Sequence, residues 1–170
     1  MATEGYLLDT SVASWVWDGG NPNHIFALTK LAELSDAPVF VCAITIGEIE
    51  RGLGVSLAMD AQRHVNVRRA MAGYEVLPID HHTGRTYGEI WARLFNQYAP
   101  RNRRGRLTKK APEDLVDPTT GRALGIQEND LWIVSVAVQY DLRFITGDKR
   151  GGMPRVLEAA NYLHQAEFWV

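Results

Sequence analysis

Short apolar runs alternate with segments of helical spacing along this chain, and this alternation limits its fold more than any other feature. The run Val39–Ala43 is apolar throughout and rich in β-forming residues, which is typical of a strand buried on both faces. Similar runs predict further strands at Tyr6–Leu8, Tyr74–Ile79, Leu142–Thr146 and, as a short fifth, Val156–Leu157. Strands that alternate with helices form a parallel sheet covered on both faces, so we predict an α/β fold.

Helices are predicted between these runs from apolar spacing, start signals and glycine stops. The predicted helices span Ser11–Trp17, His24–Leu34, Ile44–Gly54, Ser56–Ala72, Thr83–Tyr98, Asp130–Tyr140 and Glu158–Phe168. Gly52 and Gly54 are expected to stop the third of them, and Asp130–Tyr140 is apolar nearly all round, which predicts a buried helix. A chain of 170 residues suits one domain, residues 1–170.

The composition is that of a globular protein from a reducing compartment. The net charge of −2 excludes a wholly basic nucleic-acid coat, so any contact with a polyanion is expected to be local. The single cysteine, Cys42, excludes a disulfide framework within the chain. There is no run of about 18 apolar residues and no basic-then-apolar leader. We therefore expect a soluble, cytoplasmic protein without a membrane segment.

Four acidic residues each lie where an apolar segment ends or a predicted helix begins: Asp9, Glu48, Asp130 and Asp148. Carboxylates seldom interrupt apolar runs unless something compensates their burial. A divalent metal is one such compensation, and metal-bound carboxylates perform phosphoryl chemistry. Ligands of parallel sheets bind at the carboxyl ends of strands, where Asp9 and Asp148 fall, while Glu48 and Asp130 fall in the first turns of helices. We expect all four to converge on one edge.

Four motifs carry these acids in a fixed order: Leu7-Leu8-Asp9-Thr10-Ser11, Ile46-Gly47-Glu48-Ile49, Asp130-Leu131-Trp132-Ile133-Val134 and Ile145-Thr146-Gly147-Asp148. Together they closely resemble the PIN-domain nucleases, and in particular the toxins of the VapC type. The resemblance covers residues 6–168 apart from one basic segment. Each motif alone is a weak signal, because a strand that ends in Asp is common. The four in order, with strands and helices alternating between them, are a strong combined signal.

The resemblance implies a three-layer α/β/α sandwich around the parallel sheet and an endoribonuclease activity that depends on Mg²⁺ or Mn²⁺. It places catalytic and metal-binding roles on Asp9, Glu48, Asp130 and Asp148. It matches Thr10 or Ser11 to the small hydroxyl residue that commonly follows the first Asp. It also implies the role of a toxin, RNA as the substrate, a cognate antitoxin as the protein partner, and a homodimer.

The basic segment, at residues 100–125, departs from the resemblance as an insertion longer than the family's usual connection. It holds three prolines and three glycines, and its first part concentrates six of the 18 basic residues, namely Arg101, Arg103, Arg104, Arg106, Lys109 and Lys110. A structureless loop of this length is usually functional or disordered. Two interpretations stay open: a solvated loop, or a set of contacts with the RNA backbone.

Other functions stay open as well. A phosphatase of the haloacid dehalogenase type also begins with a strand-end Asp, but it requires a second Asp where this chain has Ser11. A non-catalytic PIN-like binding domain would have no reason to keep buried like charges. A DNA nuclease and a metal-free, histidine-based ribonuclease are further alternatives. For each acid taken alone, a helix cap, a turn or a surface salt bridge is the simplest interpretation.

Overall fold

The computed structural model describes residues 5–56 and 60–170, which form two compact units. The first unit comprises Met1–Pro78, Leu142–Gly147 and Ala166–Val170, and the second comprises Ile79–Asp141 and Asp148–Gln165. The sheet belongs to the first unit, and the second unit is built on helices.

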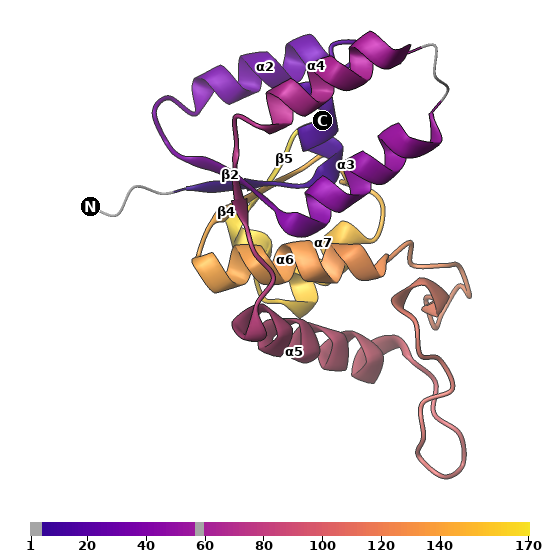
Figure 1. Ribbon diagram of the computed structural model, residues 1–170. Coiled ribbons are helices and arrows are strands. Elements are labelled where there is room, and N and C mark those ends of the chain that lie inside the picture. The colour runs from indigo at the N-terminus through magenta and orange to yellow at the C-terminus, as the bar shows by residue number, and fades with distance from the viewer. Residues whose placement is uncertain (1–4, 57–59) are drawn as a thin grey trace. The chain divides into compact units, whose positions relative to one another are not determined.

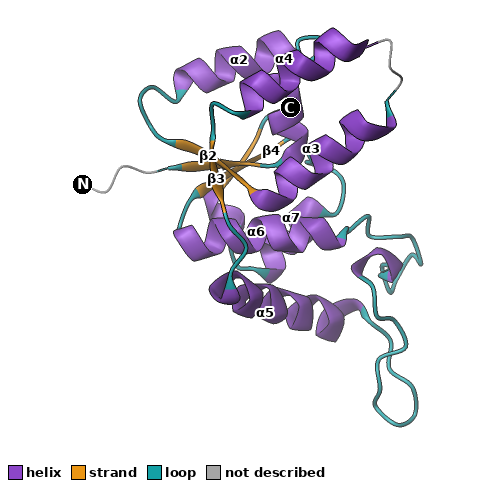
Figure 2. Ribbon diagram, in the orientation of Figure 1, coloured by secondary structure: helices purple, strands orange, loops and turns teal. Residues whose placement is uncertain are grey.

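The first unit contains a five-stranded sheet, drawn in orange in Figure 2, and its strand order is β3-β2-β1-β4-β5. The strands are β1 (Tyr6–Leu8), β2 (Val39–Cys42), β3 (Glu75–Leu77), β4 (Arg143–Thr146) and β5 (Ala166–Phe168). All four pairings are parallel, and the central strand β1 places Tyr6 beside Val39 of β2 and Arg143 of β4. The carboxyl ends of the strands therefore meet at one edge of the sheet. The predicted α/β fold with a central parallel sheet and flanking helices is confirmed.

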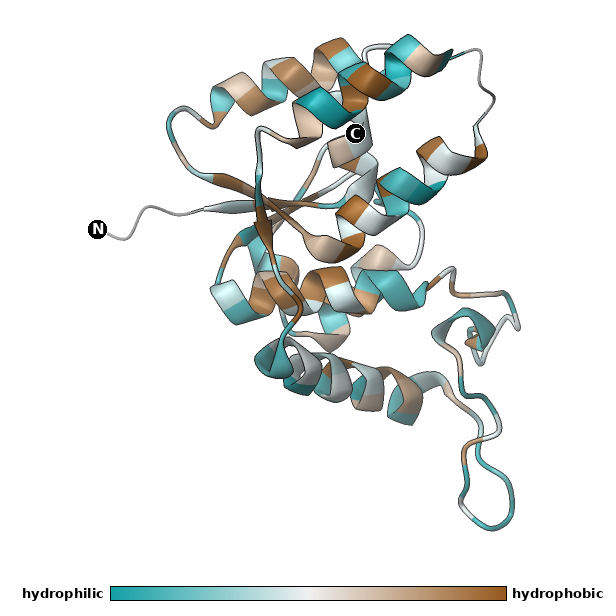
Figure 3. Ribbon diagram, viewed as in Figure 1, coloured by the Kyte–Doolittle hydropathy of each residue, from teal (hydrophilic) through white to brown (hydrophobic). Residues whose placement is uncertain are grey.

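Four helices of the first unit complete its core: α1 (Thr10–Trp17), α2 (His24–Glu33), α3 (Ala43–Val55) and α4 (Ala61–Met71), all labelled in Figure 1 except α1. α1 contacts each of the other three and also β4. β2 is apolar along its whole length (Figure 3), and its last two residues, Val41 and Cys42, are buried in the core. The buried core includes Leu8, Val12, Val16, Trp17, Ala27, Val41, Val67, Ile145 and Trp169.

The second unit contains α5 (His81–Tyr98), α6 (Glu128–Tyr140) and α7 (Met153–Ala159), with short 3₁₀ helices at Pro112–Asp114 and Leu163–Gln165. α5 and α6 run antiparallel. Near the start of α5, Thr83 Oγ1 donates to the side chain of Gln139 near the end of α6. One turn further along α5, Tyr87 stacks on Trp132 with ring centroids 3.9 Å apart. The end of α5 and the start of α6 therefore lie at the same end of this helix pair.

Residues 99–127, which connect α5 to α6, form two small hairpins instead of a structureless loop. Arg101 and Leu107 make an antiparallel bridge in the first hairpin, and Val116 and Ala123 make one in the second. Three side chains of the second hairpin are buried and anchor it: Leu115, Leu124 and Ile126 are 1%, 3% and 1% exposed. The first hairpin extends outward from the end of α5 (Figure 1).

The chain after residue 150 differs from the sequence-based prediction. Val156 and Leu157 are not a strand, because they share helical spacing with Met153 and lie in α7, which has a proline at its first turn, where a missing N–H is tolerated. The helix predicted for Glu158–Phe168 is also wrong, since its last part is β5, paired with β4.

Two predicted boundaries of the first unit are wrong as well. α3 continues through Gly52 and Gly54 to Val55, because a glycine weakens a helix by only about 1 kcal/mol while Leu53 packs against the core. α4 begins at Ala61, and Ser56 is the C-cap residue of α3. Residues 57–59 of that prediction lie outside the described residues. In the parts of the chain that the structure describes, no helix has the length and apolar character needed to cross a membrane.

Candidate functional site

The carboxyl edge of the sheet holds a buried carboxylate, that of Asp9. This residue follows β1 directly, is the N-cap of α1 and is 5% exposed. Its Oδ1 accepts a hydrogen bond from the backbone N–H of Thr10 at 2.7 Å. Its Oδ2 accepts from Ser11 Oγ at 2.7 Å and from Thr146 Oγ1 at 2.8 Å. Three donors from α1 and β4 therefore fix the orientation of this carboxylate.

Thr10 connects this edge to Glu48. Because α3 begins at Ala43, directly after β2, Glu48 lies in the second turn of α3 and not in the predicted first turn. Thr10 Oγ1 donates to Glu48 Oε2 at 2.5 Å and lies 3.2 Å from the hydroxyl of Thr45, which is fully buried. The structure thus brings Asp9, Thr10 and Glu48 together in the first unit.

The end of β4 shapes the same edge. The backbone N–H of Gly147 donates to Ser11 Oγ at 3.2 Å. A Cβ at Gly147 would lie 2.3 Å from Cη2 of Trp15, so only glycine fits against this indole ring. Sequence reasoning did not assign roles to Thr45 and Thr146, although both are fully buried here. A hydroxyl residue at the carboxyl end of an apolar strand is the signal that could have identified Thr146.

Burial distinguishes Asp9 from an ordinary helix cap. Asp80, the N-cap of α5, accepts two hydrogen bonds from backbone N–H groups, and such bonds lower its pKa from the usual value of 3.8. Asp9 caps α1 in a similar way, yet desolvation by burial raises its pKa above 3.8 despite the hydrogen bonds it accepts, and the charge of Glu48 raises it further. The ionised form of Asp9 is therefore costly in the absence of a compensating cation.

The second unit holds the other two predicted acids, and both are half-buried. Asp130 is in the first turn of α6, where its Oδ2 accepts a hydrogen bond from the backbone N–H of Gln127 at 3.1 Å as part of a capping box. Asp148 Oδ1 accepts from the N–H of Gly151 at 2.6 Å, and its Oδ2 accepts from the N–H of Met153 at 3.2 Å. These two acids have cap and turn roles of the kind that the simplest interpretation assigns to them.

The first unit offers hard oxygen donors to a cation: the carboxylates of Asp9 and Glu48 and the hydroxyls of Thr10 and Ser11. Mg²⁺ and Mn²⁺ prefer oxygen ligands, and Mg²⁺ is commonly held by one or two carboxylates while it keeps several waters. Within residues 5–56 and 60–170, no group of three or more His, Cys, Asp or Glu side chains could hold a metal ion. A cation held by the two carboxylates of Asp9 and Glu48 would keep much of its hydration shell.

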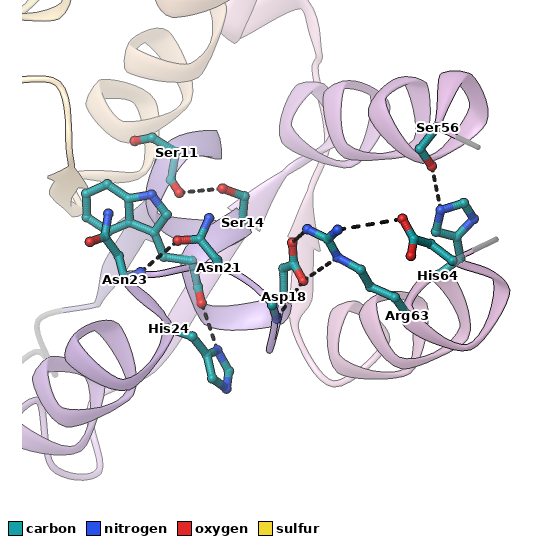
Figure 4. Close-up of polar contacts among 12 residues, drawn as sticks. Ser11, Ser14, Asp18, Asn21, Asn23, His24, Ser56, Arg63 and His64 are labelled. Atoms are coloured by element: carbon teal, nitrogen blue, oxygen red, sulfur yellow. Dashed lines mark hydrogen bonds and ion pairs between the residues drawn. The ribbon is translucent and has the colours of Figure 1, made fainter. Parts of the chain in front are cut away.

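A cavity of about 210 Å³ lies among α1, α3 and α4 of the first unit. Ser14 at its edge donates to the backbone carbonyl of Ser11 at 2.7 Å (Figure 4). Asp18 forms an ion pair with Arg63 on the cavity wall, and the guanidinium bonds to both carboxylate oxygens (Figure 4). The apolar part of the lining comes from Ile49, Leu53 and Val67.

Solved structures share this fold at low sequence identity. A chain in the structure of VapBC2 from Rickettsia felis, bound to a DNA fragment from the promoter, matches with a TM-score of 0.63 and 17% identity, covering 97% of this chain and 98% of that one. For FitAcB from Neisseria gonorrhoeae the TM-score is 0.61 and the identity 23%, covering 92% and 93%. For VapBC-5 of Mycobacterium tuberculosis, from the VapBC family of toxin–antitoxin systems, they are 0.56 and 21%, covering 97% of each chain.

The sequence itself matches one family. No curated protein matches this chain. A family model described as PIN domain matches residues 6–157, which span the motifs of all four acids. The resemblance predicted from those motifs is confirmed, and the chain belongs to the PIN domain family.

Proposed function

We propose that this protein is an endoribonuclease that hydrolyses RNA phosphodiester bonds with a bound Mg²⁺ or Mn²⁺ ion. The observation that carries the proposal is the carboxylate of Asp9, which is 5% exposed, has a raised pKa and is linked to Glu48 through Thr10. Such a carboxylate is costly to keep charged unless a cation compensates it. Membership of the PIN domain family, whose members are typically nucleases, supports the same function.

The proposal gives each acid a role at the cation. Three carboxylates bind the ion directly or through water: those of Asp9, Glu48 and Asp130. The carboxylate of Asp148 completes a second metal position. The hydroxyls of Ser11 and Thr146 hold the Asp9 carboxylate in place, and Thr10 does the same for Glu48. A bound cation supplies a water of lowered pKa and stabilises negative charge on the phosphate.

Cleavage of a labelled RNA in Mg²⁺, in Mn²⁺ and in EDTA tests this function. We expect cleavage only with a divalent ion and products with 5′-phosphate and 3′-hydroxyl ends, because water attacks phosphorus. Cleavage in EDTA with 2′,3′-cyclic phosphate ends would instead indicate a histidine-based ribonuclease. Single-stranded DNA and a phosphomonoester, assayed in parallel, test the DNA nuclease and the phosphatase. A folded, metal-binding protein that cleaves none of these substrates would favour the non-catalytic binding domain.

The proposed biological role is that of the toxin in a toxin–antitoxin pair. The structural likeness to VapBC and FitAB complexes supports a cognate antitoxin as the partner. Induced expression alone should arrest growth, and co-expression of a partner encoded by the neighbouring reading frame should relieve it. Unimpaired growth with soluble, active protein would contradict the toxin role. A homodimer is part of the same proposal, and the mass measured by light scattering tests it.

The cavity among α1, α3 and α4 is the proposed contact site for a side chain of this antitoxin, because it combines an apolar lining with an exposed ion pair. Gly52 lines the cavity, and beyond the neighbouring residues and backbone of α3 no atom lies within 4 Å of a Cβ placed there. Gly52→Trp places a large side chain at this lining position and should weaken the complex. Gly54→Trp is the matched control, since Gly54 lies on the same helix, is equally open and does not line the cavity. Equal affinity of both variants for the antitoxin would contradict this site.

A further inference from the structure

The first hairpin of the connection between α5 and α6 has no role in the proposed chemistry, yet it concentrates positive charge. We call residues 100–110 the basic hairpin. The sequence has no aspartate or glutamate from residue 90 to residue 112, and six basic residues fall within the basic hairpin. Figure 3 shows this part of the chain as mainly hydrophilic and extended away from α5. A role for the basic hairpin in substrate binding rests on the proposed ribonuclease activity.

The basic hairpin has a defined backbone. Thr108 N–H donates to the carbonyl of Pro100 at 3.0 Å, and Asn102 N–H donates to the carbonyl of Arg106 at 2.9 Å. The Asn102 side chain accepts hydrogen bonds from the N–H groups of Arg104 and Arg106 at 2.9 and 3.1 Å. Gly105 at the turn has a φ of 73°, a conformation that favours glycine. The basic side chains therefore project from a fixed frame.

The six cations divide into one that holds the hairpin and five that do not. Arg101 donates to the carbonyl of Gly105 at 2.8 Å and to Asn96 Oδ1 at 2.7 Å, so its guanidinium braces the turn against the end of α5. Across the described residues, no ion pair is found for the other five: Arg103, Arg104, Arg106, Lys109 and Lys110. Four of these five are exposed and Lys109 is half-buried.

The stability of the fold does not explain the presence of these five cations. The second hairpin of the same connection is anchored by Leu115, Leu124 and Ile126, whereas no side chain of residues 100–110 is buried. Like charges gathered on one exposed turn repel each other, which weakly disfavours the folded hairpin at low ionic strength. A polyanion that binds there would turn this repulsion into attraction.

The location of the basic hairpin suits a nucleic-acid substrate. α5 and α6 are antiparallel, so the end of α5 that carries the hairpin lies at the same end of the pair as the first turn of α6, which carries Asp130. The hairpin has no aromatic residue and its one large apolar side chain is Leu107. Protein interfaces are built on aromatic and apolar anchors, and base recognition in single strands uses aromatic stacking. Phosphate groups are the partner that this surface fits.

We propose that Arg103, Arg104, Arg106, Lys109 and Lys110 bind the phosphodiester backbone of single-stranded RNA, and that Arg101 is a positioning residue that holds the turn. Each phosphate contact on a single strand contributes about −0.7 to the slope of log affinity against log salt, so five contacts give at most about −3.5. Loss of three arginines should flatten the slope by about 1–2 units, because not every arginine contacts a phosphate all of the time.

The test measures binding of two unrelated single-stranded RNA oligonucleotides by fluorescence anisotropy, in EDTA and over a range of salt. Wild type is compared with Arg103→Ala/Arg104→Ala/Arg106→Ala. The matched control removes three exposed arginines elsewhere, as Arg69→Ala/Arg85→Ala/Arg122→Ala. We expect the hairpin variant alone to show the flatter slope, equally for both RNAs, because phosphate contacts carry no base information. Lysine at the same three hairpin positions should restore the wild-type slope.

A wild-type slope in the alanine variant would overturn the proposal. If that variant also no longer binds the antitoxin, the basic hairpin is a surface for the antitoxin and not for RNA. Metal-dependent cleavage by wild type, measured in parallel, distinguishes failure of the hairpin's role from failure of the ribonuclease activity. With cleavage intact and the slope unchanged, only the role of the hairpin fails. Wild type that neither binds nor cleaves RNA overturns the proposed function together with it.

Discussion

Asp9→Asn tests the buried carboxylate most directly, because it removes the charge and keeps the shape. The amide oxygen can still accept the hydrogen bond from the Thr10 N–H, and the NH₂ group can donate to the oxygens of Ser11 and Thr146, which now donate to Asp9. We therefore expect a folded variant. Asp9→Ala would leave these buried donors unpaired, at about 1–3 kcal/mol for each group.

The expected magnitude follows from the electrostatics of the site. Without metal, Asp9→Asn should raise the free energy of unfolding at neutral pH, because burial and Glu48 both disfavour the charged form of Asp9. With Mg²⁺ at about 100 times its Kd, wild type gains about 2.7 kcal/mol. For a chain of this size that is about 5–11 °C in Tm. The variant should lose most of this gain, and its cleavage rate should fall by more than about 100-fold.

Thermal unfolding followed by circular dichroism, with and without Mg²⁺, measures the first effect, and cleavage of labelled RNA measures the second. Asp80→Asn is the matched control: Asp80 is also an N-cap, but its pKa is lowered, so this variant should respond to Mg²⁺ as wild type does. If Asp9→Asn unfolds, or is less stable than metal-free wild type at neutral pH, the carboxylate is structural. An equal gain in Tm from Mg²⁺ in both proteins would refute ligation by Asp9.

Three further perturbations test other parts of the same site. Thr10→Val removes the hydroxyl that donates to Glu48 and should lower cleavage by about 10–100-fold, while Thr10→Ser keeps most of the activity; equal rates would contradict the link. Gly151→Ala puts a Cβ 2.4 Å from Asp148 Oδ2, so cleavage should fall although every acid is retained, and an unchanged rate would exclude Asp148 from the site. The pH dependence of metal-free unfolding isolates Asp9: its folded pKa is raised, so the folded state binds the extra proton and stability falls as pH rises from 3.8 through the raised pKa. The curve for Asp9→Asn should lack this fall, and parallel curves would show that Asp9 is not the group concerned.

The sequence predicts the central part of this molecule because local pattern and tertiary role agree there. β1, β2 and β4 are apolar runs that the sheet buries, so their positions were predicted to within one residue. Asp9 could be identified because a carboxylate directly after such a run has no solvent to face. The hydroxyls of Thr45 and Thr146 could not, since their role depends on hydrogen bonds between residues far apart in the chain.

The errors arise where tertiary context decides between two local preferences. Met153, Val156 and Leu157 satisfy the helical period as well as a short apolar run does, and the pairing of β5 with β4 is invisible in a strand of three residues. The two hairpins of residues 99–127 could not be predicted either. Their folded conformation depends on side-chain hydrogen bonds, on the positive φ of Gly105 and on the burial of Leu115. None of these can be inferred from the composition of the segment.

Because the basic hairpin is closed at its base, its turn can be replaced by a different sequence. Pro100 and Thr108 are already joined by a backbone hydrogen bond of 3.0 Å, and no buried side chain lies between them. Residues 101–107 can therefore be shortened, lengthened or recharged with little cost to the rest of the second unit, because loop closure changes slowly with length. Selection can tune this turn while the core stays unchanged, and a protein engineer can graft a different turn at the same two residues.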